Sequence, residues 1–239
     1  MPKFMVPFIE NMVDVKGDKI CGFQAIVDFL GLTEKSHIMV RRHLIIQELK
    51  DHRNDYVWVF AGEGRYNYIL NSLHPPKNSG GIALVDKWLT LSDMSHIVAT
   101  YYNRLVILLT NHEIRTSESF FALRGVPPLK QNPPIMCLAL IPNHFVFLFL
   151  KDGCPLLPSS MEWNNHKSDE TTTWEFMYLD QQARFRELMK IEKREKPPSP
   201  KKSQTKPILF CVTLQKNQRK NLKLLGKMKK ILFHLMRYD

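Results

Sequence analysis

Two apolar runs separated by only two residues constrain the fold of this chain more than any other feature. Residues 134–141 read PIMCLALI and residues 144–150 read HFVFLFL, with Pro142 and Asn143 between them. Each run is short, continuous and bounded by turn or polar residues, as in strands that are buried in a sheet. So tight a connection is typical of a hairpin. The sequence therefore predicts two antiparallel strands at the centre of a sheet.

Apolar residues at helical spacing precede this hairpin. The pattern recurs in residues 21–31, 36–52, 64–73 and 91–103. Ser36 is an acceptable N-cap for the second of these helices. A further apolar run at residues 104–110 has the character of a buried strand. The fold class indicated is α+β, or mixed α/β, with a central, mostly antiparallel sheet flanked by helices.

Charge divides the chain into two parts. Residues 1–186 carry as many acidic as basic side chains, so the whole net charge of +11 arises from residues 187–239. The beginning of the second part combines a run of charges with four prolines between Pro197 and Pro207. Such a composition buries too little apolar surface to order itself. We therefore expect one globular domain followed by a basic, largely disordered tail.

The predicted tail contains two segments suited to binding a partner. Residues 193–206 form a basic cluster, typical of nuclear import or of a weak nucleic-acid contact, in which SPKK resembles minor-groove-binding repeats of linker-histone tails. A solvated segment without a partner is the alternative. Residues 220–236 place apolar side chains near helical spacing between lysines. This favours an amphipathic helix for an anionic membrane surface or a groove in a partner, or one that packs on the main domain.

Several classes of protein are excluded by the sequence. The first residues lack the apolar segment and cleavage site of a secretory signal, and no run reaches the roughly 18 apolar residues of a membrane helix. We therefore expect a cytoplasmic or nuclear protein without a transmembrane segment. The 4 cysteines form no C-x-x-C pair and the 9 histidines form no H-E-x-x-H motif. Free thiols, no metal and no cofactor are expected.

One cysteine lies where a thiol can act as a nucleophile. Cys21 follows a short polar loop and begins the first predicted helix, where unpaired N–H groups and the helix dipole favour the reactive thiolate. A nucleophilic thiol also needs a histidine base that is oriented by a third group. His144 begins the second strand of the hairpin and Asp18 lies on the loop before the cysteine, so both are candidates. The alternative is a small core cysteine and a structural histidine.

Around these residues the sequence resembles the ovarian tumour (OTU) family of cysteine peptidases. GDKICGFQAIVDFLG is similar to the family's catalytic-cysteine motif, Asp-Gly-Asn-Cys followed by a helix, and NHFVFLFL is similar to its histidine strand. VRRHLIIQEL, DKWLTLSDMSHIVATYYNRLVILL, FFALRGVPP and KDGCPLLP follow in the order expected of the domain. The resemblance covers roughly residues 4–186 and is greatest to plant OTU-like sequences associated with transposons.

The resemblance implies a papain-like fold and hydrolysis of the isopeptide or peptide bond that follows ubiquitin or a ubiquitin-like protein. Cys21 is the implied nucleophile and His144 the implied general base, which later protonates the leaving amine. Asp18 is the implied third member. Some members of the family carry this acid two residues after the histidine, but that position is Val146 here.

The implied oxyanion hole contains the main departure from the family motif. Backbone N–H groups of Lys19, Ile20 and Cys21 are implied to line it, and Phe145 to shield the site from water, with a core aromatic as the alternative. The family's Gly-Asn is Lys19-Ile20 here, and a side chain held at φ > 0 costs on the order of 1 kcal/mol. A displacement of about 1 Å can cost roughly a hundredfold in rate, although a lysine beside a thiol also favours the thiolate.

Two functions therefore stay open after the sequence is read. The first is an OTU-type deubiquitinase that acts through Cys21, His144 and Asp18. The second is a catalytically impaired, transposon-derived OTU domain that binds ubiquitin, chromatin or nucleic acid.

Overall fold

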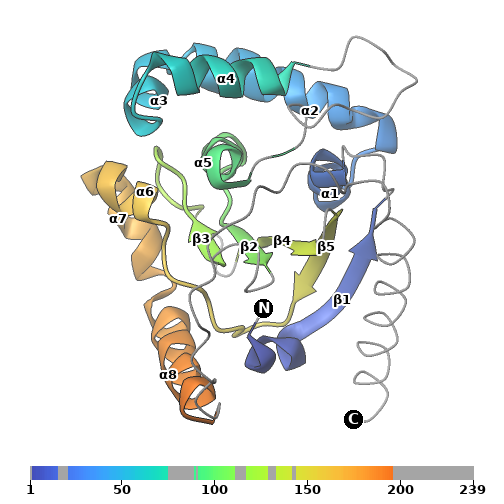
Figure 1. Cartoon of the computed structure of the whole chain (residues 1–239), viewed down its shortest axis with the longest axis vertical. Coiled ribbons are helices and arrows are strands. Elements are labelled where there is room, and N and C mark those ends of the chain that lie inside the picture. The colour runs from blue at the N-terminus through green and yellow to red at the C-terminus, as the bar shows by residue number, and fades with distance from the viewer. Residues whose placement is uncertain are drawn as a thin grey trace, which may run out of the picture. The chain divides into compact units, whose positions relative to one another are not determined.

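A five-stranded sheet with the strand order β1-β5-β4-β2-β3 organises the described part of the chain (Figure 1). Its strands are Ile9–Asp14 (β1), Val106–Thr110 (β2), Glu118–Phe120 (β3), Met136–Ile141 (β4) and His144–Leu150 (β5). Every neighbouring pair is antiparallel except β2 and β4, which run parallel. The predicted α+β class with a mostly antiparallel sheet is confirmed.

The computed structural model describes residues 2–15, 21–74, 89, 91–110, 117–128, 133–141 and 144–195. The chain divides into two units, Met1–Lys196 and Pro197–Asp239. The described residues all belong to the first unit. Of the basic cluster at 193–206, residues 196–206 lie outside the described residues, as does the whole predicted helix at 220–236.

The predicted hairpin forms the middle of the sheet. β4 and β5 pair in a register that sets Leu138 opposite Phe147 and Ile141 opposite His144. Leu138 and Phe147 are buried, because one face of these strands is covered by α1. The short continuous apolar runs are thus the buried centre of the sheet, as the sequence predicts.

The helices form two groups along the chain, one before β2 and one after β5 (Figure 1). The α-helices are Cys21–Phe29 (α1), His37–His43 (α2), Arg53–Val59 (α3), Glu63–Leu73 (α4), Leu91–Tyr102 (α5), Met161–His166 (α6), Asp169–Phe176 (α7) and Leu179–Glu195 (α8). Short 3₁₀ segments lie at Lys3–Phe8 (η1) and Glu34–Ser36 (η2), and a π-helix at Leu44–Lys50 (η3). α1 packs on β5 and β4, and α5 on β2 and β3, with α2, η3 and α4 beyond them.

The predicted helix at 36–52 differs from expectation in one respect. It is an α-helix only over His37–His43 and continues as the π-helix Leu44–Lys50. The inward side of this wider helix carries Glu48 among apolar residues. A buried carboxylate needs hydrogen-bond or ion-pair partners. Tyr56 and Arg124 are such partners of Glu48, so contacts with other segments stabilise the π-helix.

Glu48 is the centre of a buried polar cluster that joins three segments. The Tyr56 hydroxyl donates a hydrogen bond to its carboxylate, and the Arg124 guanidinium pairs with the same oxygen. Arg124 also donates to Asp55 at 3.3 Å. Burial, and secondarily the charge of Glu48, raises the pKa of Tyr56 well above its ordinary value. The cluster fastens α3 and the segment after β3 to η3.

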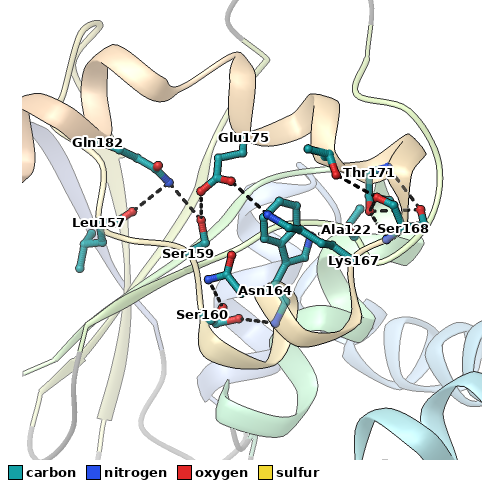
Figure 2. Close-up of polar contacts among 12 residues, drawn as sticks. Ala122, Leu157, Ser159, Ser160, Asn164, Lys167, Ser168, Thr171, Glu175 and Gln182 are labelled. Carbon is teal, nitrogen blue, oxygen red and sulfur yellow. Dashed lines mark hydrogen bonds and ion pairs between the residues drawn. The ribbon is translucent and has the colours of Figure 1, made fainter.

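A second polar cluster, drawn in Figure 2, connects the helices that follow the sheet to the segment between β5 and α6. The Ser159 hydroxyl donates to Glu175 at 2.8 Å, and Lys167 pairs with the other oxygen of that carboxylate at 3.4 Å. The amide of Gln182 donates to Ser159 at 3.2 Å and to the Leu157 carbonyl at 3.5 Å. These contacts tie α7 and α8 to the segment that follows β5.

A fully buried histidine connects α5 to the beginning of α6. His96 contacts the Phe121 carbonyl through Nδ1 at 3.2 Å and the Ser160 hydroxyl through Nε2 at 2.8 Å. A carbonyl only accepts, so Nδ1 carries the proton and Nε2 accepts from Ser160. As the N-cap of α6, the Ser160 hydroxyl in turn accepts a hydrogen bond from the backbone N–H of Trp163. Burial lowers the pKa of His96 to about 4, which keeps the ring neutral.

The last described helix crosses the predicted domain boundary at residue 186. α8 runs from Leu179 to Glu195, because the residues that follow 186 are mostly strong helix formers. The helix also packs on the beginning of the chain: Phe185 lies edge-on to Phe4, and the Lys3 N–H donates to Glu192 at 3.0 Å. Among the described helices, none is long and apolar enough to span a membrane.

Candidate active site

Cys21 is the first residue of α1, where the sequence predicts it. The helix buries its first seven residues, mainly against the hairpin, so Cys21 is held on a rigid element, and the residue is 6% exposed. The Phe145 N–H, at the beginning of β5, donates a hydrogen bond to the Cys21 sulfur at 3.4 Å. Packing of α1 on β5 therefore brings the cysteine to the strand that begins with His144.

His144 bonds to a carboxylate from the neighbouring strand. Its Nε2 donates to Asp14 Oδ1 at 2.8 Å, with the two side chains 14% and 30% exposed respectively. Asp14 ends β1 and pairs with Val146, two residues after His144 on β5. Residues i and j ± 2 on adjacent strands share a face and lie within reach of one another. The register of β1 and β5 thus places the Asp14 carboxylate diagonally across from His144, within hydrogen-bonding distance of its ring.

The histidine joins the cysteine and the carboxylate into one chain of contacts. A hydrogen bond with the Cys21 thiol raises the pKa of His144, burial lowers it, and the bond to Asp14 and the charges of both partners raise it further. The net shift is upward from the ordinary value of 6.5. Because Nε2 faces Asp14, Nδ1 is the nitrogen left for the thiol. The arrangement suits transfer of the thiol proton to the imidazole.

The structure brings together some predicted residues and leaves others outside the described ranges. Cys21 and His144 are in contact, and Phe145 is buried beside them. Asp18, Lys19 and Ile20 lie outside the described residues, so their predicted roles as acid and oxyanion-hole donors stay predictions. Asp14 is the residue of the site that the sequence does not predict. Its only signal is a carboxylate at the end of a strand that the local pattern does not predict.

The other described cysteines are unsuited to nucleophilic chemistry. Cys137 and Cys154 are buried free thiols. Burial raises the pKa of Cys154 to about 12 and that of Cys137 well above its ordinary value. The predicted free-thiol state is confirmed for these two and for Cys21, while Cys211 lies outside the described residues. In the ranges that the structure describes, no three His, Cys, Asp or Glu side chains are arranged to hold a metal ion.

Comparison with known proteins gives distant structural similarity. No model of a known protein family matches the sequence, and no curated protein matches it. The chain is similar to the OTU domain protease of Farallon virus, with 17% identity, a TM-score of 0.41, and coverage of 63% of this chain and 89% of that one. It is also similar to the OTU domain of OTUD1, with 16% identity, a TM-score of 0.36, and coverage of 57% and 82% respectively. Both are OTU domains, the family that the sequence motifs resemble.

Proposed function

We propose that this chain is an OTU-type cysteine peptidase that hydrolyses the isopeptide or peptide bond following ubiquitin or a ubiquitin-like protein. The observation that carries the proposal is the contact chain from Cys21 through His144 to Asp14. A nucleophile, a base and an orienting acid in this order are the parts that acyl transfer through a thioester requires.

In the proposed reaction His144 accepts the proton of the Cys21 thiol, and the sulfur forms a bond to the carbonyl carbon of the scissile bond. The imidazolium then donates this proton to the leaving amine as the C–N bond breaks, which leaves a thioester. His144 next takes a proton from water, whose oxygen attacks the thioester carbonyl. The C–S bond breaks, the imidazolium returns its proton to sulfur, and the carboxylic acid product leaves as a carboxylate after losing the second proton of the water to solvent.

The partners of His144 and Cys21 have separate roles in this proposal. Asp14 keeps the proton on Nε2, so that Nδ1 faces the thiol, and stabilises the imidazolium. The Phe145 N–H, which bonds to the Cys21 sulfur, stabilises the thiolate that forms when His144 takes the thiol proton, because a hydrogen bond to an ionised acceptor is stronger than one to a neutral acceptor. The Phe145 ring shields the site from water. Backbone N–H groups of Lys19, Ile20 and Cys21 remain the proposed oxyanion-hole donors.

The choice of ubiquitin rests on the sequence motifs. The similarity of residues 17–31 and 143–150 to the OTU cysteine motif and histidine strand supports it, as does the order of the segments between them. That order also supports a place among plant OTU-like sequences associated with transposons.

A ubiquitin probe with a thiol-reactive group at its C-terminus tests the proposal. The full-length chain is expected to form a covalent adduct at Cys21, and Cys21→Ala and His144→Ala are expected to lose it. Absence of an adduct with the folded wild-type chain would contradict peptidase function.

A catalytically impaired binding module is the second candidate, and the Lys19-Ile20 departure from the family motif favours it. Such a module is expected to bind ubiquitin without reacting with the probe. A nucleic-acid role for residues 193–206 is expected to give an affinity that falls steeply with salt and is lost when these basic residues are neutralised. Salt-independent binding would exclude that role.

A further inference from the structure

The residue after the nucleophile is a glycine at a point where the chain has no room for a side chain. A Cβ atom built on Gly22 would lie 2.6 Å from Leu89 Cβ, 2.8 Å from Leu89 Cδ2 and 3.1 Å from Phe145 Cδ2. The two Leu89 distances are shorter than real Cβ atoms show. Gly22 is not among the described glycines with positive φ, so close packing, and not an unusual backbone, requires the glycine.

A second helical glycine has no such neighbours. Gly64, in the first turn of α4, has nothing within 4 Å of the place of its Cβ. Glycine inside a helix is destabilising relative to alanine, because it loses more backbone entropy on folding. Both glycines are the second residue of a helix. The space where a side chain would lie is filled at Gly22 and open at Gly64.

The space beside Gly22, here called the notch, lies between the element that carries Cys21 and the element that carries His144. Gly22 follows Cys21 on α1, and Phe145 follows His144 on β5. Leu89, which is 4% exposed, lies at the same point. Its side chain is thus wedged against the first turn of α1, next to the residue whose N–H bonds to the Cys21 sulfur.

We propose that Leu89 is a positioning residue for the nucleophile, seated in the notch that Gly22 leaves beside Phe145. Held there, it fixes the first turn of α1 against β5 and so fixes the Cys21 sulfur relative to the His144 ring. An error of about 1 Å in such a placement costs roughly a hundredfold in rate. The active-site role rests on the proposed function, but the positioning itself can be measured without ubiquitin.

Alkylation of Cys21 by iodoacetamide measures this positioning in the full-length chain. The rate is followed from about pH 5 to about pH 10, where a thiol ionises without help. Peptide-level mass spectrometry separates Cys21 from Cys137, Cys154 and Cys211. Near neutral pH the rate depends on the contact with His144, whereas at the alkaline end it depends on access alone.

Gly22→Ala is expected to lower the neutral-pH rate, because the thiol moves away from His144, and to leave the alkaline rate unchanged. Leu89→Ala is expected to lower the neutral-pH rate as well, because the first turn of α1 loses the side chain that packs against it. The double variant Gly22→Ala with Leu89→Gly is expected to recover much of the rate, since glycine at residue 89 removes both Cβ and Cδ2, the two leucine atoms that the new methyl group would meet. Leu89→Met and the matched control Gly64→Ala are expected to keep the wild-type profile.

A wild-type pH profile in Gly22→Ala or in Leu89→Ala would overturn the proposal, as would a double variant slower than both single variants. If Gly22→Ala does not fold, as judged by circular dichroism, the profiles of Leu89→Ala and Leu89→Met decide alone. An intact alkylation profile with no capture by the ubiquitin probe would count against the proposed function and leave the positioning role standing.

Discussion

Asp14 holds the Nε2 side of the His144 ring, with 2.8 Å between its Oδ1 and the ring nitrogen. These residues are separated by 130 positions in the chain and meet only because β1 pairs with β5. The register that sets Asp14 opposite Val146 puts its side chain on the same face as His144. The carboxylate that orients the histidine thus comes from the edge strand of the sheet.

Replacing Asp14 by asparagine is expected to reduce the rate of capture by the ubiquitin probe by at least about tenfold, because the ring loses the partner that holds its tautomer. The matched comparison is Asp18→Asn, the acid that the family motif implies. Probe kinetics on both variants decide between them. A large loss in Asp18→Asn with little change in Asp14→Asn would show that Asp18 is the acid of the working enzyme.

The same carboxylate is expected to shift the pH dependence of the reaction. The Cys21 thiol and then Asp14 raise the pKa of His144 above 6.5, so the imidazolium survives to higher pH than in a free histidine. Removing Asp14 lowers that pKa, so the neutral ring that accepts the thiol proton persists to lower pH, and the acidic limb of the rate profile is expected to move toward lower pH. Rates of probe capture measured across the limb in wild type and Asp14→Asn check this, and an unmoved limb would contradict it.

The sequence predicts the parts of this site that local pattern encodes. The hairpin follows from two continuous apolar runs, and α1, α4 and α5 follow from apolar residues at helical spacing. β1 escapes the same reasoning: within Ile9–Asp14 only Ile9 is buried, so the strand shows no alternation of apolar and polar residues. An edge strand of this kind is stabilised by pairing with β5, a contact that no local pattern contains.

The sequence does not predict the helices after the sheet, α6 to α8, for a related reason. The segment DETTTWEF of α7 has several threonines, which are poor helix formers, and its helix is stabilised by a capping box between Ser168 and Thr171 and by packing of Trp174. In the site itself, the motif predicts Cys21 and His144. Asp14 follows only from the three-dimensional register.

The pair of Glu48, which is buried, and Arg124, which is 28% exposed, is expected to matter for stability. Arg124→Met removes the positive partner of the buried Glu48 carboxylate and leaves the hydrogen bond from Tyr56, and we expect a cost on the order of 1–3 kcal/mol, below that of breaking a fully enclosed pair. Adding Glu48→Gln removes the uncompensated charge, so the double variant is expected to be more stable than Arg124→Met. Urea unfolding of the three proteins checks this order, and a double variant less stable than Arg124→Met would contradict it.

Acid is expected to destabilise the fold through His96. The pKa of this histidine falls from 6.5 in the unfolded chain to about 4 in the fold, chiefly because the ring is buried. Above pH 6.5 the ring is neutral in both states and contributes no pH dependence. As the pH falls from 6.5 toward 4, the unfolded state binds a proton that the folded state excludes, and the free energy of unfolding falls by on the order of 3 kcal/mol.

Urea unfolding of wild type and His96→Gln at several pH values in this window separates the histidine from the carboxylates. Glutamine carries no titrating proton, so the variant is expected to be less stable near neutral pH, because the contacts to Phe121 and Ser160 change, yet to lose less stability on acidification. Lys50→Gln, an exposed substitution in η3, is a matched control that is expected to keep the wild-type slope. An equal slope in His96→Gln would mean that other groups carry the acid sensitivity, since His96 would then bind its proton in the folded state as readily as in the unfolded one.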